Sequence, residues 1–207
     1  MFTARENERC RQDFPALQQL HAGRERVFLD GPGGSQVLER LPTERLRVQD
    51  AAAPYRIETG TLNHAAIDGV RAAVDYLAGW GQGMTLRERI VDAMAGIAGY
   101  EHHLAKAYYD GVQRLPGVRV FGPDFATRSR APTVSITLAG HTAGEAAAVL
   151  GALGIFVWDG HFYAARAVEL LGLAERGGLL RTGISMYTTG CDVQRLLEAL
   201  EQLTSTG

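Results

Sequence analysis

The sequence predicts an α/β protein made of a two-layer sandwich, a long helix packed on it and an N-terminal tail. From Val118 onward, short runs of β-branched and aromatic residues alternate with runs of helical periodicity, which is typical of a sheet covered by helices. Before them, one helical pattern extends over roughly 30 residues, longer than a small isolated domain needs. The first 37 residues differ in pattern from the rest and are expected to form the tail.

The N-terminal segment, residues 1–37, contains one strand pattern and a turn. The stretch "ERVFLD" (25–30) predicts a strand, and "GPGGS" (31–35) predicts a turn. Pro32 lies inside the turn and no G-x-G-x-x-G or G-x-x-x-x-G-K-[ST] motif is completed, which excludes a Rossmann-type or P-loop nucleotide site. Residues 38–54 are polar and Ala-rich and are expected to be a connector.

Two helices are predicted next. Apolar residues at helical spacing predict the first from Asn63 to about Leu77. The second begins after Thr85, where Glu88 completes a capping box, and Pro116 ends it. Its apolar stripe consists of Leu86, Ile90, Met94, Ile97, Leu104, Tyr108, Val112 and Leu115.

The region 117–207 is predicted to be the small α/β domain. We expect its strands at 118–122, 132–138, 154–158 and 178–187, and its helices at 142–153, 162–173 and 190–203. Strands interleaved with helices on one side make a two-layer sandwich of the usual size for a small domain.

The composition excludes several classes of partner. The chain of 207 residues is 46% hydrophobic and 21% charged, as in ordinary soluble proteins, and its net charge of -2 argues against nucleic acid. Its first residues lack an apolar core and no run could span a bilayer, so we expect neither a leader nor a membrane partner. Cys10 and Cys191 form no CxxC pair, which favours reduced thiols in a cytoplasmic protein.

The stretch "RIETGTLNH" (56–64) before the first helix has two interpretations. A Gly60–Thr61 turn would expose backbone N–H groups at the positive end of the helix dipole, which suits an anion such as phosphate. Alternatively, Thr61 or Asn63 simply caps the helix. The local residues favour the cap and leave the anion site open.

Arg181 is the strongest candidate binding residue. It interrupts an apolar strand, where a charge is costly unless it is paired, and its planar fork suits a carboxylate. The alternative is a side chain that points to solvent. The aromatic-rich loop "WDGHFYA" (158–164), with Asp159 and His161, is a second candidate as a pocket rim, although aromatic residues more often serve packing.

Other candidate groups are weaker. His64 and Asp68 share a helix face, but two residues favour a solvated surface over a metal site. Of the 21 basic residues only Lys106 is a lysine, so any mechanism that needs a lysine has one candidate.

Several of these stretches together resemble a known family. "RIETGTLNHAAIDGVRAAVDYL", "APTVSITLAGH", "GIFVWDGHFYA" and "LLRTGISMYTT" are similar to the C-terminal half of cysteine desulfurase-like proteins, which are class V aminotransferases of pyridoxal-phosphate fold type I. "FPAL" and "VFLDGPGGSQV" are similar to that family's first residues. The resemblance implies an N-terminal family segment (1–37) and a C-terminal region (55–207) that contains the small domain (117–207).

The resemblance also implies roles for three residues. Gly60 and Thr61 would reach the pyridoxal phosphate of a partner subunit, which implies a homodimer. Arg181 would hold the α-carboxylate of an amino-acid substrate.

The chain departs from the family in two ways that decide its expected function. "GGSQV" passes straight into "LERLP", so the large domain with the Schiff-base lysine is missing, and Lys106 lies mid-helix and matches no cofactor lysine. Tyr163 stands where the desulfurases carry their nucleophilic cysteine. We therefore expect a truncated transferase-family member with no catalytic residue and no metal, inactive alone.

Two alternatives from other classes remain open. The chain could be a non-catalytic interaction module that docks on a full-length homologue through an exposed face of the helix between Thr85 and Leu115. It could also be a gene remnant or an assembly artefact without a selected role.

Overall fold

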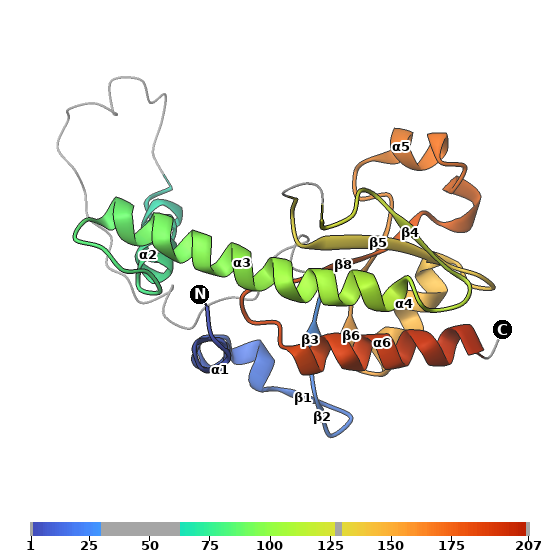
Figure 1. The fold of residues 1–207 in the computed structure, drawn as a ribbon, viewed down its shortest axis with the longest axis horizontal. Helices are drawn as coiled ribbons and strands as arrows, with labels where there is room; N and C mark the ends of the chain where they lie inside the picture. Colours follow the sequence, from blue (N-terminus) through green and yellow to red (C-terminus); the bar gives the residue numbers. More distant parts are fainter. Residues whose placement is uncertain (1, 30–62, 127–129, 206–207) are drawn as a thin grey trace. The chain divides into compact units, whose positions relative to one another are not determined.

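The computed structural model describes residues 2–29, 63–126 and 130–205 (Figure 1). The chain forms two compact units, Met1–Gln36 with Ile97–Gly207, and Val37–Gly96. Gly60 and Thr61, the predicted turn at 31–35 and the predicted connector at 38–54 lie outside the described residues. No helix in the described ranges is long and apolar enough to cross a membrane.

An antiparallel four-stranded sheet organises the larger unit, with the strand order β4-β5-β8-β7. Ile136 lies opposite Leu180, and Ser135 lies opposite Arg181. Because side chains alternate between the faces of a strand, the first pair faces the core and the second faces away from it. The strands are β4 (Val118–Phe121), β5 (Thr133–Leu138), β7 (Trp158–Gly160) and β8 (Leu179–Gly183).

Helices cover both faces of this sheet, but unequally (Figure 1). The main core lies on the face covered by α4 (Ala143–Ala152), α6 (Gly190–Ser205) and the C-terminal part of α3 (Leu86–Val112). The short helix α5 (Ala165–Leu170) lies on the other face, over a smaller apolar cluster. The two-layer prediction is therefore confirmed for the main core, with α5 as a partial third layer.

Capping boxes begin three of the described helices. Thr3 and Glu6 form one before α1 (Ala4–Gln12). The Thr85 amide donates to the Glu88 carboxylate at 3.0 Å, and the Glu88 amide donates to Thr85 Oγ1 at 3.2 Å, which starts α3. Thr142 and Glu145 form the same reciprocal pair before α4.

Helix α2 (His64–Ala78) begins at Asn63, whose side chain accepts a hydrogen bond from the Ala66 amide at 3.0 Å. Asn63 is thus the N-cap, as one of the two local interpretations predicts.

Three predicted elements of the small domain were wrong in extent. The strand expected at 178–187 is β8, which ends at Gly183. The expected strand at 154–158 is divided into β6 (Ile155–Phe156), which pairs in parallel with β3 (Val27–Phe28), and β7, which pairs with β8. The expected helix at 162–173 begins only at Ala165, because Phe162 and Tyr163 adopt φ values of 51° and 61°, outside the helical region.

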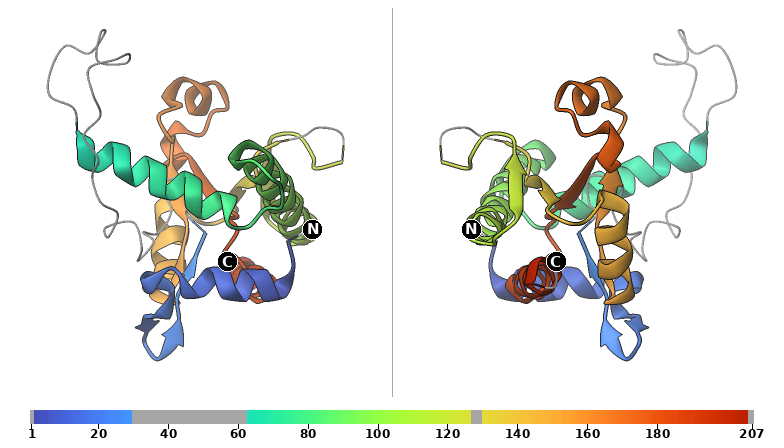
Figure 2. Two further views of the ribbon diagram at one scale, coloured as in Figure 1. Left: turned by 90° about the vertical axis from the view of Figure 1, so that its left-hand side faces the viewer. Right: turned by 90° about the vertical axis from the view of Figure 1, so that its right-hand side faces the viewer.

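The described part of the N-terminal segment, residues 2–29, is packed onto the larger unit. The Arg11 side chain donates to the Tyr187 carbonyl at 2.7 Å and pairs with Asp192 at 3.1 Å, and Figure 2 shows α1 beside α6. The expected tail is therefore an integral part of this unit. Its elements are α1 (Ala4–Gln12), the 3-10 helix η1 (Pro15–Gln18), β1 (Leu20–His21), β2 (Arg24–Glu25) and β3.

Candidate carboxylate-binding site

Arg181 lies in the middle of β8, on the sheet face away from the main core. Its direct neighbours across the strands are Ser135 on β5 and Trp158 on β7. The residues on either side of it, Leu180 and Thr182, are buried in the core, whereas Arg181 itself is only partly buried. The Arg181 side chain is therefore neither fully solvated nor fully buried.

Two features of the Arg181 guanidinium favour an anionic ligand. Its Cζ lies 4.2 Å from the centroid of the Phe162 ring, which shields part of the group from water. Its Nε is buried and has no hydrogen-bond acceptor among the described residues. A buried donor without an acceptor is costly, and a carboxylate bound at the edge of the guanidinium would supply one.

Burial lowers the pKa of Arg181 below its ordinary value. Because that ordinary value is far above neutrality, the group remains a cation at pH 7. The site therefore presents a fixed positive charge on a partly desolvated face of the sheet.

The aromatic loop after β7 lies beside Arg181, as a pocket-rim interpretation requires. Phe162 packs against the cluster that Leu179 forms with Val168 and Leu173, and it contacts Arg181 from there. Tyr163 is 99% exposed, so it contributes no packing. The sequence identified this loop but not Phe162 as its contact residue, and the aromatic run was the one available signal.

Lys106, the single lysine, is separate from this site. It lies on α3, with its side chain half exposed, and its Nζ pairs with the Asp110 carboxylate at 2.5 Å, one helical turn onward. Helix α3 covers the core face of the sheet, whereas Arg181 is on the other face.

Candidate metal ligands do not gather in the described ranges. There, no group of three or more His, Cys, Asp or Glu residues could hold an ion. Asp68, one of the two residues considered for a metal, forms an ion pair with Arg71 one turn along α2, with 3.9 Å between Asp68 Oδ1 and Arg71 Nη1. Cys10 is buried, Cys191 is exposed, and both are free thiols.

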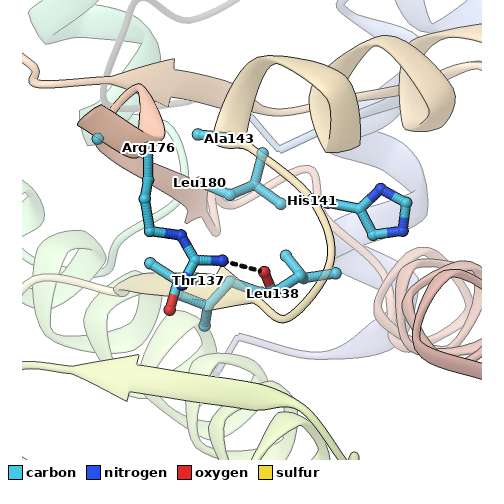
Figure 3. Close-up of a pocket in the computed structure, with 8 residues that line it drawn as sticks. Thr137, Leu138, His141, Ala143, Arg176 and Leu180 are labelled. Carbon is cyan, nitrogen blue, oxygen red and sulfur yellow. Dashed lines mark hydrogen bonds between the residues drawn. The ribbon is translucent and has the colours of Figure 1, made fainter. Parts of the chain in front are cut away.

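A small hollow at the edge of the sheet is too small for a substrate. Arg176 donates to the Leu138 carbonyl at 2.9 Å beside it, and His141 and Ala143 complete one side (Figure 3). Its volume of about 10 Å³ holds at most one water molecule. A wider groove of about 120 Å³ between Arg24, Arg195 and Glu198 is polar and open. Arg181 lines neither hollow.

Glu101 is a titratable group that the sequence did not single out. Burial raises its pKa to about 7, and the hydrogen bond that its carboxylate accepts from the Met186 amide opposes this rise only in part. The neighbouring Tyr100 hydroxyl donates to the Thr188 carbonyl at 2.7 Å. Helix α3 therefore fixes the segment that follows the Arg181 strand.

Comparison with known proteins finds cysteine desulfurases among the curated relatives. The chain is 26% identical over 153 residues to a cysteine desulfurase of Serratia proteamaculans, covering 74% of this chain and 33% of the relative. It is 29% identical over 188 residues to a probable cysteine desulfurase of Mycolicibacterium paratuberculosis, covering 89% of this chain and 24% of the relative. The chain thus spans a third or less of these relatives.

Solved structures agree in fold. The crystal structure of the cysteine desulfurase CsdA from Escherichia coli matches with a TM-score of 0.58 at 24% identity, over 75% of this chain and 34% of that one. The apo structure of a cysteine desulfurase from Thermococcus onnurineus matches with a TM-score of 0.62 at 23% identity, over 83% and 42%. At this identity the likeness establishes the fold alone.

A model of the family described as Aminotransferase class-V matches residues 32–196, which is most of the sequence. This span includes α2, α3 and the strand that carries Arg181. The chain therefore belongs to the class-V aminotransferase family.

Proposed function

We propose that this chain is a truncated, cysteine desulfurase-like member of its family that retains the carboxylate-binding arginine but is not catalytically competent alone. The observation that carries the proposal is Arg181, a partly desolvated cation whose buried Nε lacks an acceptor in the described residues. In this role it binds the α-carboxylate of an amino acid through two parallel hydrogen bonds.

Enzymes of this family use pyridoxal phosphate, and the residues present do not fit its covalent attachment. A Schiff base needs a lysine amine that can be deprotonated within reach of the substrate. Lys106, the single lysine of the sequence, pairs with Asp110 on the helix layer that covers the other face of the sheet. We therefore derive no catalytic step through the cofactor for this chain.

Gly60 and Thr61 belong to the proposal as donors to a cofactor phosphate bound by a partner subunit. Both lie outside the described residues. The proposal for them is supported by the sequence, in which Gly-Thr stands shortly before the start of α2. In this proposal the partner is a second copy or a full-length homologue, and the setting is the cytoplasm.

An absorbance titration with pyridoxal phosphate, followed by borohydride reduction and peptide mass mapping, tests whether the chain alone can attach the cofactor covalently. The wild-type chain and its Lys106→Arg variant should give the same weak, non-saturating absorbance and no specific label. A saturable aldimine band that is lost in Lys106→Arg, with the label on Lys106, would overturn the proposal.

A second function, docking as a non-catalytic module, is favoured by exposed apolar side chains. On α2, Ile67, Val70 and Val74 are 54%, 66% and 36% exposed at helical spacing. Near the start of α3, Val91 and Met94 are 54% and 46% exposed. Surfaces of this kind commonly bind another protein.

Co-purification with an intact cysteine desulfurase homologue tests docking. Val70→Glu should abolish the complex, whereas Ala65→Glu, an exposed position on the opposite side of the same helix, should leave it intact. A wild-type chain that remains a lone monomer in the mixture would rule this function out.

A further inference from the structure

The Arg181 guanidinium lies over the Phe162 ring on the outer face of the sheet. The distance from Arg181 Cζ to the ring centroid is 4.2 Å. The two side chains come from different elements, since Arg181 lies in β8 and Phe162 in the loop between β7 and α5. Their contact therefore depends on the conformation of that loop.

The contact with Phe162 supplies no hydrogen-bond acceptor to the guanidinium, so the buried Nε of Arg181 still lacks one among the described residues. The N–H donors of arginine lie in the plane of the group. A side chain held against a ring also has fewer rotamers to lose when a ligand binds. Phe162 thus restricts Arg181 without competing for its donors.

Phe162 is itself held in place by two independent features. Its ring packs on the cluster of Val168, Leu173 and Leu179. Its φ of 51° and the φ of 61° at Tyr163 put two successive non-glycine residues in the left-handed region. Bulky residues persist there only where the surrounding structure imposes it.

The neighbouring Tyr163 provides a natural contrast. It shares the loop and the unusual backbone, but its side chain is 99% exposed, whereas that of Phe162 is partly buried against the cluster. The loop thus directs one aromatic ring onto Arg181 and the next into solvent.

We propose that Phe162 is a positioning residue for carboxylate binding, which presets the Arg181 guanidinium so that its donor edge receives a carboxylate. This inference rests on the proposed role of Arg181 and adds the residue that orients it. The ligand is the carboxylate of a free amino acid.

Titration of the full ¹⁵N-labelled chain with L-alanine, followed by NMR, tests the inference, and L-alaninamide serves as the ligand without a carboxylate. Backbone amides of Ser135 and Thr182 report binding beside the site. The Arg181 Nε–H resonance reports the contact with Phe162, because a ring over the guanidinium displaces it upfield.

Four variants separate positioning from folding. Phe162→Leu keeps an apolar side chain for the cluster and should weaken L-alanine binding roughly fivefold, with loss of the upfield displacement. Phe162→Tyr should restore affinity to within about twofold of wild type. Tyr163→Leu, the same kind of change one residue away, should bind as wild type, and Arg181→Gln should not bind.

The outcomes distinguish the inference from the function on which it rests. A wild-type chain that does not bind L-alanine, or binds the amide equally well, overturns the proposed function of Arg181. If wild type binds and Phe162→Leu binds as tightly, only the positioning role is overturned. Failure of Phe162→Tyr to restore binding overturns it as well, since packing alone would then explain the loss.

Discussion

Arg11 and Asp192 form a buried ion pair, 3.1 Å from Nη1 to Oδ2, across 181 residues of sequence. Both side chains are about one-tenth exposed, and Arg11 also donates to the Tyr187 carbonyl. The Asp192 carboxylate in turn accepts from the Thr189 amide at 2.9 Å. The pair therefore joins the N-terminal helix to the start of the C-terminal one.

Removal of one charge of this pair should destabilise the larger unit strongly. Arg11→Met leaves a buried carboxylate without its cation, and we expect a loss of about 3 kcal/mol in the free energy of unfolding. Urea unfolding, followed by Trp158 fluorescence in a Trp80→Phe background, measures it. Arg5→Met, at an exposed position of the same helix, should change stability by less than about 0.5 kcal/mol. Equal effects of the two variants would contradict a buried pair.

Glu101 should make stability depend on pH near neutrality. Its folded-state pKa of about 7 lies above its ordinary value of 4.5, so the folded chain holds this proton more tightly than the unfolded chain. The contribution is fully present below about pH 4.5 and is lost as pH rises through about 7. Glu101→Gln, which can still accept from Met186, should remove this dependence.

The measurement is the difference in unfolding free energy between wild type and Glu101→Gln across pH 4.5 to 8. The difference should grow with pH in favour of the variant, to at most about 3 kcal/mol. A difference that stays constant over this range would show that Glu101 titrates normally.

Two adjacent glycines should respond differently to alanine. Gly177 and Gly178 have φ values of 73° and 88°, so both substitutions strain the backbone. At Gly177 a Cβ would meet open space, whereas at Gly178 it would overlap the carbonyl oxygen of Gly160 at the end of β7. Gly177→Ala should cost about 1 kcal/mol and Gly178→Ala at least about 2 kcal/mol more.

Thermal and urea unfolding of the two variants measure the difference. Gly178→Ala should also shift the amide resonances of β7, because the strand must move to make room. Equal destabilisation would mean that backbone conformation alone, and not the close approach of Gly160, requires glycine here.

Glycines on α3 provide a second matched pair. A Cβ at Gly99 would meet nothing within 4 Å, so Gly99→Ala should stabilise the helix by about 0.5–1 kcal/mol through propensity alone. A Cβ at Gly111 would lie 2.6 Å from a methyl carbon of Leu197 on α6. Gly111→Ala should therefore stabilise less than Gly99→Ala, because the end of the Leu197 side chain must move, and Leu197→Ala in the same chain should remove part of this difference. If both alanines stabilise equally, α3 and α6 are less closely packed than described.

Local signals in the sequence predict the elements whose cause is local. The Thr85–Glu88 and Thr142–Glu145 pairs lie three residues apart and satisfy each other's backbone groups, so the starts of α3 and α4 are predicted correctly. Strand alternation in β5 likewise needs no distant partner to be recognised.

Elements determined by distant partners are not predicted. Helix α1 begins with a capping box of its own, Thr3 with Glu6, which the sequence analysis did not use. The helix is short and polar, and its position depends on Asp192 and on the Met186 carbonyl, to which Asn7 donates. The expected strand at 154–158 is divided because its first half pairs with Val27 and Phe28, which no local pattern indicates.

The sequence predicts the candidate site only in part, for the same reason. The sequence identifies Arg181 because a charge in an apolar strand is unusual, yet it cannot identify the Phe162 ring that covers it. That contact requires positive φ values in the intervening loop, which neither residue type favours.

The parallel pairing of β3 with β6 has a consequence for the order of folding. Val27 pairs with Ile155, and the Leu29 carbonyl accepts a hydrogen bond from the Gly183 amide at 2.7 Å. The strand near the N-terminus therefore pairs with segments that lie more than a hundred residues later in the sequence. Closing so long a loop is slow, and an unpaired apolar strand is prone to wrong associations meanwhile. During synthesis on the ribosome, the N-terminal segment therefore cannot complete its pairing until β8 has emerged.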